Sequence, residues 1–443
     1  LDHDEEPTRR LRSDRALRRW GQPRWAAVLA GAIVVLILIG GAALITRRTE
    51  TPVITVPDTT TPAPTTTLPS TTTVPVAPLV GTPATGPWTN HEIVGNSVIG
   101  DDLVAGWVTS GGPGFVATGN TYTGGDIWGR GQIWTSTDGS SWTWVSDDDR
   151  ALFVEGYWPS GLLSVDAGFL VWGSNHRQGG TVLWHSSNGT DWRLATGEAH
   201  LADDYFTDGL ALAGGGYLLY GVPCVWSVET DICSRPDRPR ILKSSDGFAW
   251  EVLTTPVTFT AIVQTETGDL LAAQRRASEP STWISHDEGQ TWQRHGPDRS
   301  IELGQPSAKV STIELTPYGM IAAGVDADDQ SVVWISDNGK TFTPALLLPT
   351  GAGVSAIAHG QGWLVAVGQE EIPQVVEGVN SGPAIWASDD GREWQSVPLL
   401  GTYVGGGGLN DIAYHDSVFI AVGSHRAEIG GEALVLRWED NSK

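Results

Sequence analysis

Short apolar runs separated by glycine and polar residues recur along this chain from about residue 100 to its end. One run reads Gly-Phe-Val-Ala-Thr-Gly at residues 114–119, and similar runs begin at residues 168, 216, 319 and 362. They are too short for helices, are rich in β-branched and aromatic residues, and are bounded by turn-forming residues. The pattern therefore predicts an all-β fold.

Six copies of a short motif follow these runs at regular intervals. Each copy has a Ser, one or two variable residues, an Asp or Asn, a Gly and then an aromatic residue; we name it the corner motif. Its Asp or Asn positions are Asp138, Asn188, Asp246, Asp287, Asn338 and Asp390. They are separated by 50, 58, 41, 51 and 52 residues. Because three short strands precede each copy and one follows, each period predicts a four-stranded sheet.

The residue types of the corner motif suit a tight turn between the third and fourth strands. The Asp or Asn side chain can accept backbone N–H groups, the Gly supplies a positive φ, and the aromatic residue packs beneath the turn. A seventh unit without the motif occupies residues 410–438, and a strand around residues 91–94 could complete it. Such pairing of the two ends would remove two open sheet edges.

The corner motif resembles the Asp-box, or bacterial neuraminidase repeat, of sialidases and several other propeller families. Only the copy at residues 285–292 has the full eight-residue spacing, and the other five are one residue shorter. The resemblance covers about 260 residues. It implies a β-propeller, for which we expect seven blades with six or eight as alternatives, and a structural role for the six Asp and Asn residues.

An uncharged apolar stretch at residues 25–45 is long enough to cross a membrane, since a helix needs ~20 such residues. Seven arginines precede it and two follow closely, which favours a cytoplasmic tail at residues 1–24 and an extracellular C-terminal part. We therefore expect a single-pass protein of the cell membrane. A cleaved signal peptide is the alternative. The first residue is Leu1 rather than Met, which leaves open a truncated or misassigned start.

Thr and Pro dominate residues 46–87, where no apolar periodicity occurs. Such a segment forms no core and favours extended backbone, so it predicts a disordered stalk, glycosylated or plain. The propeller then occupies residues 88–443.

The net charge of the chain is −24, and because residues 1–50 carry +3, the remainder carries −27. An acidic domain repels phosphate groups, so nucleic acid is not expected as a partner. The acidic loop at residues 326–329 lacks the EF-hand pattern, and no zinc, phosphate-loop or nucleophile-elbow motif occurs. We therefore expect neither a metal nor a cofactor.

Long and unequal loops between the second and third strands, and the connections from one blade to the next, are predicted to gather on the face opposite the corner motifs, where binding sites commonly lie. Their exposed aromatic and cationic residues are candidates for contacting a protein or glycan ligand, with local loop packing as the alternative for Trp. These are Tyr122, Trp128, Trp158, Trp226, Arg235, Arg275 and Arg426. The two cysteines, Cys224 and Cys233, lie in one such loop, and outside the cell they predict a disulfide.

The resemblance to sialidases implies three arginines that bind the substrate carboxylate, a Tyr nucleophile paired with a Glu, and an acid/base Asp. The first of these arginines belongs to a Phe/Tyr-Arg-Ile-Pro segment ahead of the first Asp-box. This chain departs from that pattern, because it has no Arg between Arg48 and Arg130. We therefore expect a non-catalytic binding or scaffold module for protein or glycan. A cell-surface glycoside hydrolase with two catalytic carboxylates is the alternative.

Overall fold

The computed structural model describes most of the chain beyond residue 81. The described residues are 82–84, 86–93, 102–122, 130–145, 157–166, 168–175, 181–195, 206–221, 225–227, 232–234, 239–274, 282–295, 309–326, 328–339, 341–376, 379–399, 406–426 and 431–439. The chain divides into two units, Leu1–Pro75 and Val76–Lys443, and the described residues all belong to the second. The predicted tail and membrane span lie outside them. Within the described residues, no helix is long and apolar enough to cross a membrane.

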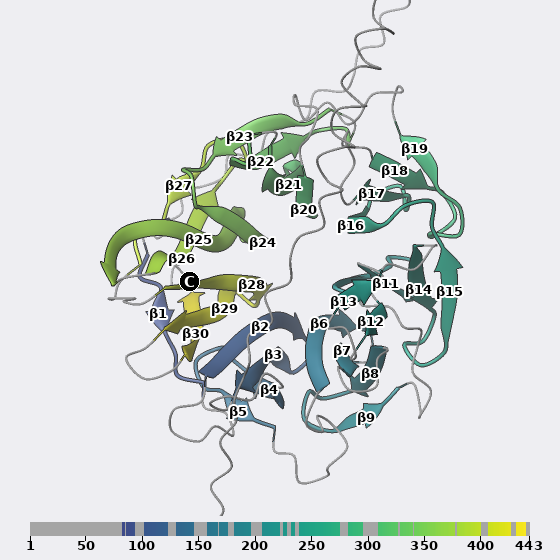
Figure 1. The fold of residues 1–443 in the computed structure, drawn as a ribbon, viewed down its shortest axis with the longest axis horizontal. Coiled ribbons are helices and arrows are strands. Elements are labelled where there is room, and N and C mark those ends of the chain that lie inside the picture. The colour runs from purple at the N-terminus through teal and green to yellow at the C-terminus, as the bar shows by residue number, and fades with distance from the viewer. Residues whose placement is uncertain are drawn as a thin grey trace, which may run out of the picture. The chain divides into compact units, whose positions relative to one another are not determined.

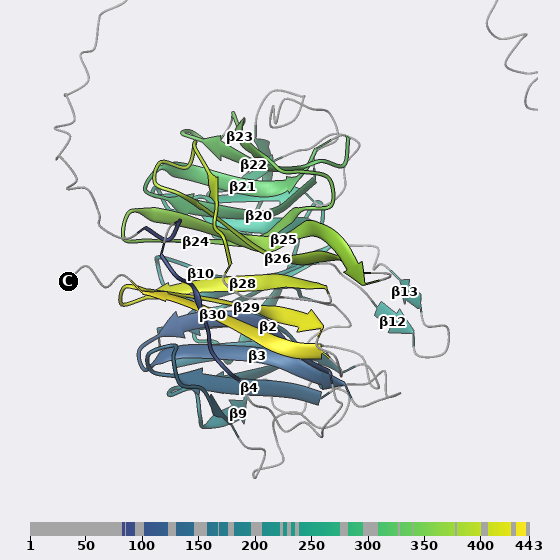
Figure 2. The same cartoon turned by 90° about the vertical axis from the view of Figure 1, so that its left-hand side faces the viewer.

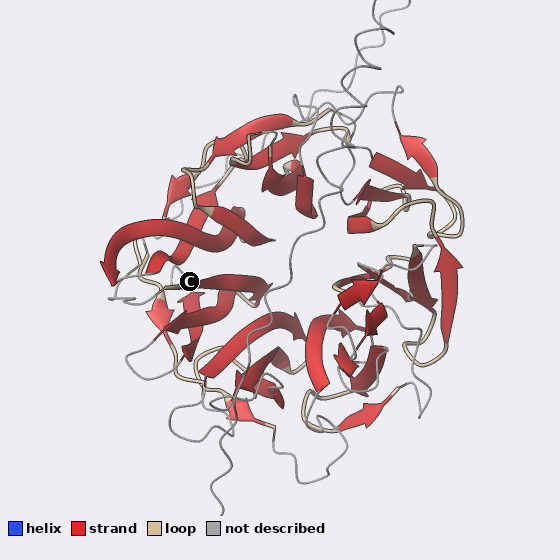
Figure 3. Cartoon of the chain, viewed as in Figure 1, coloured by secondary structure: helices blue, strands red, loops and turns tan. Residues whose placement is uncertain are grey.

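Seven four-stranded antiparallel sheets are arranged in a ring around a central axis (Figure 1). Each sheet forms one blade, and the described residues contain strands and turns but no helix (Figure 3). The prediction of a seven-bladed, all-β propeller is thereby confirmed.

The strands of blades 1 to 6 follow one another in sequence from the axis outward. Blade 1 has β2 (Asp102–Gly111), β3 (Gly114–Tyr122), β4 (Arg130–Ser136) and β5 (Thr143–Trp144), and blade 2 has β6 (Tyr157–Val165), β7 (Gly168–Asn175), β8 (Thr181–Ser186) and β9 (Trp192–Leu194). Blade 3 has β10 (Asp208–Ala211), β11 (Tyr217–Tyr220), β14 (Arg240–Ser244) and β15 (Trp250–Thr254). Blade 4 has β16 (Phe259–Gln264), β17 (Leu270–Gln274), β18 (Thr282–Ser285) and β19 (Gln293–His295). Blade 5 has β20 (Lys309–Thr316), β21 (Gly319–Val325), β22 (Ser331–Ser336) and β23 (Thr343–Leu347), and blade 6 has β24 (Gly353–Gly360), β25 (Trp363–Val376), β26 (Val379–Ser388) and β27 (Gln395–Ser396).

Blade 7 combines the two ends of the described chain and closes the ring. Its inner strands are β28 (Gly407–His415), β29 (Val418–Arg426) and β30 (Gly431–Glu439), and its outer strand is β1 (Thr89–Asn90). Thr89 pairs with Arg437 and Asn90 with Leu436. The prediction that an N-terminal segment completes the seventh sheet is correct, with the strand just ahead of residues 91–94.

The packing of the ring already begins within the segment that the sequence assigns to the stalk. Ala84 is buried in a cluster with Trp88 and Trp438. The Trp88 indole is only 3% exposed, and its Nε1 donates to the carbonyl of Pro83 at 3.1 Å. The residues just before β1 therefore anchor the closing strand.

Alternate residues of each blade face two different neighbours. In β25, Leu364 and Ala366 pack in the cluster shared with blade 5, whereas Val365 and Val367 pack in the cluster shared with blade 7. This follows from the two-residue period of a strand, which turns successive side chains to opposite faces. Each blade thus has two buried apolar faces, and the core lies between blades.

Six of the seven inner strands shift their register against the second strand by one residue, at the same level of each blade. The residues left out of the pairing are Gly106, Ser160, Thr260, Ser311, Ser355 and Asn410. Such bulges increase the local twist of a strand. Two of them also join neighbouring blades, because Thr260 Oγ1 donates to Val310 O and Asn410 Nδ2 donates to Ala105 O, each at 2.9 Å.

The six corner motifs form the turns between the third and fourth strands of blades 1 to 6. In each, the Ser hydroxyl accepts the Gly amide at 2.8–2.9 Å. In blade 1, Asp138 Oδ2 accepts the Ser140 hydroxyl, and Asp138 Oδ1 accepts the amides of Ser140 and Ser141. These bonds, the Ser140 hydroxyl first, lower the pKa of Asp138 to about 2. Gly139 has a φ of 75°, and a Cβ there would collide with Ile420 of blade 7.

An additional two-stranded sheet lies between β11 and β14 and was not predicted. It pairs β12 (Val225–Ser227) with β13 (Ile232–Ser234), and it projects beyond the blades in Figure 2. Trp226 pairs with Cys233 in its register. Cys224 lies outside the described residues, so the disulfide stays a prediction.

We expect Trp88→Ala to lower the free energy of unfolding by about 3–5 kcal/mol, the usual cost of truncating a buried Trp. Denaturant unfolding of the purified chain measures this change. Leu347→Ala is the matched control, since Leu347 is 59% exposed and should change stability by less than ~0.5 kcal/mol. Equal stability of the two variants would contradict the anchoring role of Trp88 beside β1.

Candidate functional site

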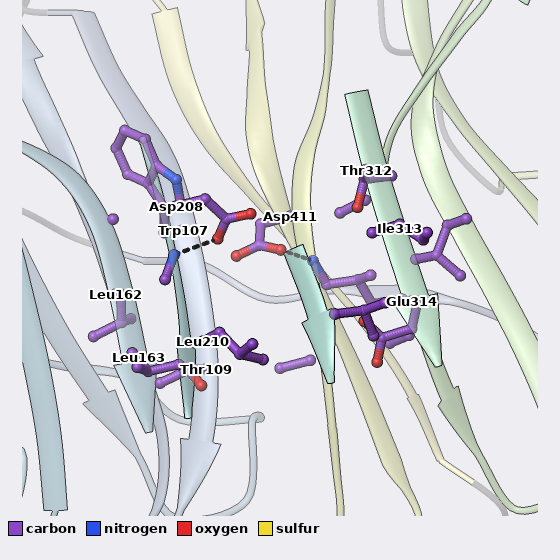
Figure 4. Close-up of a pocket in the computed structure, with 18 of the residues that line it drawn as sticks. Trp107, Thr109, Leu162, Leu163, Asp208, Leu210, Thr312, Ile313, Glu314 and Asp411 are labelled. Carbon is purple, nitrogen blue, oxygen red and sulfur yellow. Dashed lines mark hydrogen bonds between the residues drawn. The ribbon is translucent and has the colours of Figure 1, made fainter. Parts of the chain in front are cut away.

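A large hollow of the described structure lies on the ring axis, and we name it the axial cavity. All seven inner strands line it, and its volume is about 910 Å³. That is within the size range of pockets that hold small ligands. Three carboxylic acids, Asp208 of β10, Glu314 of β20 and Asp411 of β28, belong to its wall (Figure 4).

Asp208 begins β10 and is held in place by two hydrogen bonds. Its Oδ1 accepts the Gly209 amide at 2.7 Å, and its Oδ2 accepts the Tyr220 hydroxyl at 2.8 Å. Tyr220 lies opposite Asp208 in the register of β10 and β11 and is only 3% exposed. Burial raises the pKa of Asp208 although both hydrogen bonds oppose the rise. Burial and the adjacent carboxylate raise the pKa of Tyr220 well above its usual value.

Asp411 directly follows the bulge at Asn410 and joins blade 7 to blade 1. Its Oδ2 accepts the Val108 amide at 2.9 Å, and its Oδ1 accepts the Ile412 amide at 2.8 Å. Burial nevertheless raises the pKa of Asp411 to about 7, and the charge of Asp208 adds to the rise. Asp411 therefore has a structural role at the closing seam as well as a place in the cavity wall.

Glu314 has the least compensated charge of the three acids. No described residue donates a hydrogen bond to it, and the nearest basic atom is His359 Nδ1, 3.8 Å from Glu314 Oε1. Burial lowers the pKa of His359, so its imidazole is mostly neutral near pH 7. Burial raises the pKa of Glu314 to about 7, with further contributions from Asp208 and Asp411.

The acids are exposed to a cavity that the seven inner strands surround. The Glu314 side chain is 41% exposed, and Asp208 is also exposed. Such a volume solvates charge less well than bulk water, which accounts for the raised pKa values despite the exposure. Neither Lys nor Arg occurs among the described residues that line the cavity. Its field is therefore negative wherever the acids ionise.

Two chemical roles fit this arrangement. Ionised carboxylates in a cavity can hold an ammonium or guanidinium group, and a carboxyl group with a pKa near 7 can donate a proton at neutral pH. Among the described residues, no three His, Cys, Asp or Glu side chains are grouped so as to hold a metal ion.

Tyr122 and Trp158, the two nominated ligand-binding residues whose side chains the structure describes, do not line the axial cavity. Tyr122 at the end of β3 and Trp158 at the start of β6 form an edge-to-face pair, with ring centroids 5.6 Å apart and planes at 82°. The structure thus brings two of the nominated residues together, at the seam between blades 1 and 2. For Trp226 in β12 and Arg426 in β29, the structure describes the strand but not the side chain. Trp128, Arg235 and Arg275 lie outside the described residues.

Asp208, Glu314 and Asp411 were not among the residues predicted from the sequence to contact a ligand. One sequence pattern could have identified them, which is an acidic residue inside or at the start of the first strand of a blade. Glu314 and Asp411 interrupt the apolar stretches at residues 310–315 and 410–414. Because the first strand of a propeller blade lies at the axis, such residues are candidates for a shared central site.

Comparison with solved structures finds propellers at low sequence identity. YCF48 bound to D1 peptide is 13% identical with a TM-score of 0.48, covering 80% of this chain and 96% of that one. The Cps50 (Swd1) propeller domain of Myceliophteria thermophila is 12% identical with a TM-score of 0.47, covering 79% and 99%. Trypanosoma rangeli sialidase in complex with the inhibitor DANA is 13% identical with a TM-score of 0.39, covering 76% and 55%. No family model and no curated protein matches the chain.

We expect Glu314→Gln to make stability less dependent on pH. Between about pH 4.5 and 7, the Glu314 carboxyl group is protonated in the folded chain but ionised in the unfolded chain. The resulting stabilisation is complete below this window and is lost as pH rises through it. Solvent screens the charge of this exposed side chain. We therefore expect the free energy of unfolding of the variant, relative to that of the parent, to rise by only about 1 kcal/mol from pH 5 to pH 8.

Denaturant unfolding at several pH values measures this difference. Glu251→Gln, which alters an exposed residue of the outer strand β15, is the control and should follow the parent at every pH. A parent and a Glu314→Gln variant with parallel pH profiles would contradict the raised pKa.

Proposed function

We propose that this protein is a membrane-anchored, extracellular binding module that holds a cationic group of a protein ligand in its axial cavity. The observation that carries the proposal is the presence of three carboxyl groups, without a Lys or Arg among the described lining residues, in a cavity of about 910 Å³. The anchor at residues 25–45 and the extracellular location rest on the sequence pattern alone.

A cationic side chain suits the cavity for an energetic reason. Ionised carboxylates that share a poorly solvating volume repel one another, which favours protonation in the empty cavity. An Arg guanidinium brings five N–H donors and a permanent charge, so it can replace those protons with charge-assisted hydrogen bonds. Glu314 is the most available acceptor because no described residue donates a hydrogen bond to it.

The same field disfavours a sialidase. The substrate of such an enzyme carries a carboxylate, which ionised Asp208, Glu314 and Asp411 would repel. Among the described lining residues there is no Arg to bind it.

A different glycoside hydrolase is the second candidate, and one specific observation favours it. The pKa values of Glu314 and Asp411 are raised to about 7, which is the property required of a general acid at neutral pH. A second carboxylate would then act as base or nucleophile.

Calorimetric titration of the purified full chain with two peptides tests the binding function. The peptides are Gly-Ser-Arg-Ser-Gly and its citrulline counterpart, which keeps the shape of the side chain but lacks the charge. We expect the Arg peptide alone to bind, at least tenfold more tightly at pH 8 than at pH 6, since the carboxyl groups ionise over this range. Glu314→Gln should weaken binding at least tenfold at pH 8, and Glu251→Gln should not.

Equal binding of both peptides, or no effect of Glu314→Gln, would contradict this function. A panel of fluorogenic glycosides distinguishes the second candidate, a glycoside hydrolase, from the binding module. Turnover that is lost in Glu314→Gln or Asp411→Asn, with the fold retained, would identify a hydrolase.

A further inference from the structure

In three blades, a residue of the third strand contacts the corner of the next blade, from the position directly before the Ser of the corner motif or its equivalent in blade 7. In blade 3, Lys243 Nζ donates to Glu288 Oε2 of blade 4 at 2.8 Å. The equivalent residue of blade 7, Arg437, donates from Nε to the Asp138 carbonyl of blade 1 at 3.0 Å. In blade 2, the His185 ring lies 4.8 Å from the Phe248 ring of blade 3.

The equivalent residue of blade 4 is Ile284, as the register shows, because Leu271 pairs with Ile284 as Leu218 pairs with Lys243. An aliphatic side chain cannot make the polar or ring contacts found at these three seams, and the equivalent residues of blades 5 and 6, Ile335 and Ala387, are aliphatic as well. Between blades 4 and 5 the structure has a groove of about 780 Å³, which we name the seam groove.

The seam groove has an apolar floor and an aromatic wall. Leu271, Ile284 and Met320 contribute to its lining, and Leu271 and Met320 are buried. Tyr318 of blade 5 also lines it, and its hydroxyl donates to the Gly362 carbonyl of blade 6 at 2.7 Å. That hydrogen bond holds the half-buried ring at one position, so a ligand does not have to order it.

Polar side chains surround this floor and offer both donors and acceptors. Asp269 Oδ1 bonds to His286 Nδ1 at 2.8 Å, and the His286 side chain is 58% exposed. The bond fixes the imidazole and leaves Nε2 available, because no described residue bonds to it. Gln293 and Arg294 of β19 and Asp337 of blade 5 also belong to the lining, and all three are exposed. Asp337 Oδ1 accepts a hydrogen bond from Arg392 of blade 6 at 2.9 Å.

We propose that the seam groove binds a neutral oligosaccharide. A pyranose ring presents an apolar C–H face and hydroxyl groups that each donate and accept, which matches an apolar floor with an aromatic wall and a mixed polar rim. The rim contains one cationic side chain, Arg294, and two anionic ones, Asp269 and Asp337. It therefore favours a neutral ligand that forms hydrogen bonds over a charged ligand. This site lies on the side of the corner motifs, and its lining shares only Leu315 with that of the axial cavity.

A glycan array carrying neutral and sialylated oligosaccharides tests the proposal with the labelled full chain. We expect binding to a subset of neutral glycans and a tenfold or greater loss in Ile284→Lys, because a lysine there would fill the floor and reach towards the corner of blade 5 as Lys243 reaches Glu288. Leu347→Lys adds the same charge at an exposed site of blade 5 and should bind like the parent.

Arg294→Ala is the second variant, and Arg193→Ala, an exposed arginine of the equivalent outer strand β9, is its matched control. Arg294→Ala should weaken neutral-glycan binding several-fold with an unchanged melting temperature, and Arg193→Ala should not. Binding that both groove variants retain, binding of sialylated glycans alone, or no glycan binding would overturn the proposal. These variants should not change binding of the Arg peptide in the axial cavity. The experiments therefore test the two proposed sites independently.

Discussion

Pairing of β1 with β30 closes the ring, and the burial of every blade depends on this closure. Successive residues of a strand such as β25 pack into two different clusters, one towards each neighbouring blade. An open ring would expose an apolar face at each end and leave unpaired strand edges. Only Thr89 and Asn90 pair directly, so buried Trp88 and the Asp411 bond to the Val108 amide support a short strand at the closing seam.

Closure also determines the chemistry at the axis. Each inner strand turns one face towards the axial cavity, so a polar residue there meets residues from blades far away in sequence. Asp208, Glu314 and Asp411 come from blades 3, 5 and 7, yet Asp208 and Asp411 both contribute to the raised pKa of Glu314, and Asp208 contributes to that of Asp411. Asp208 and Asp411 have hydrogen-bond donors within the fold, whereas Glu314 depends on a proton or on a ligand for compensation. The fold thus creates a site that none of the blades contains alone.

The blade repeat could be predicted because its determinants are local. The Ser136, Asp138 and Gly139 contacts lie within one turn, so the same residue types recur wherever that turn occurs. The acids could not be assigned to one site, because their meeting depends on the number of blades and on the direction each strand faces. The bulge at Ser311 reverses which faces of β20 successive side chains occupy. A two-residue period counted from Val310 therefore assigns Glu314 and its neighbours to the wrong face of the strand. The β12–β13 hairpin lies within a loop whose polar residues gave no strand pattern.

The most direct measurement is the titration of the Glu314 carboxyl group in the full chain by ¹³C NMR. Glutamate side chains would be labelled at the carboxyl carbon, and the Glu314→Gln spectrum would assign the resonance. An uncompensated acid on the axis of a closed ring predicts a midpoint near pH 7, whereas a midpoint near the ordinary value of 4.5 would contradict the account.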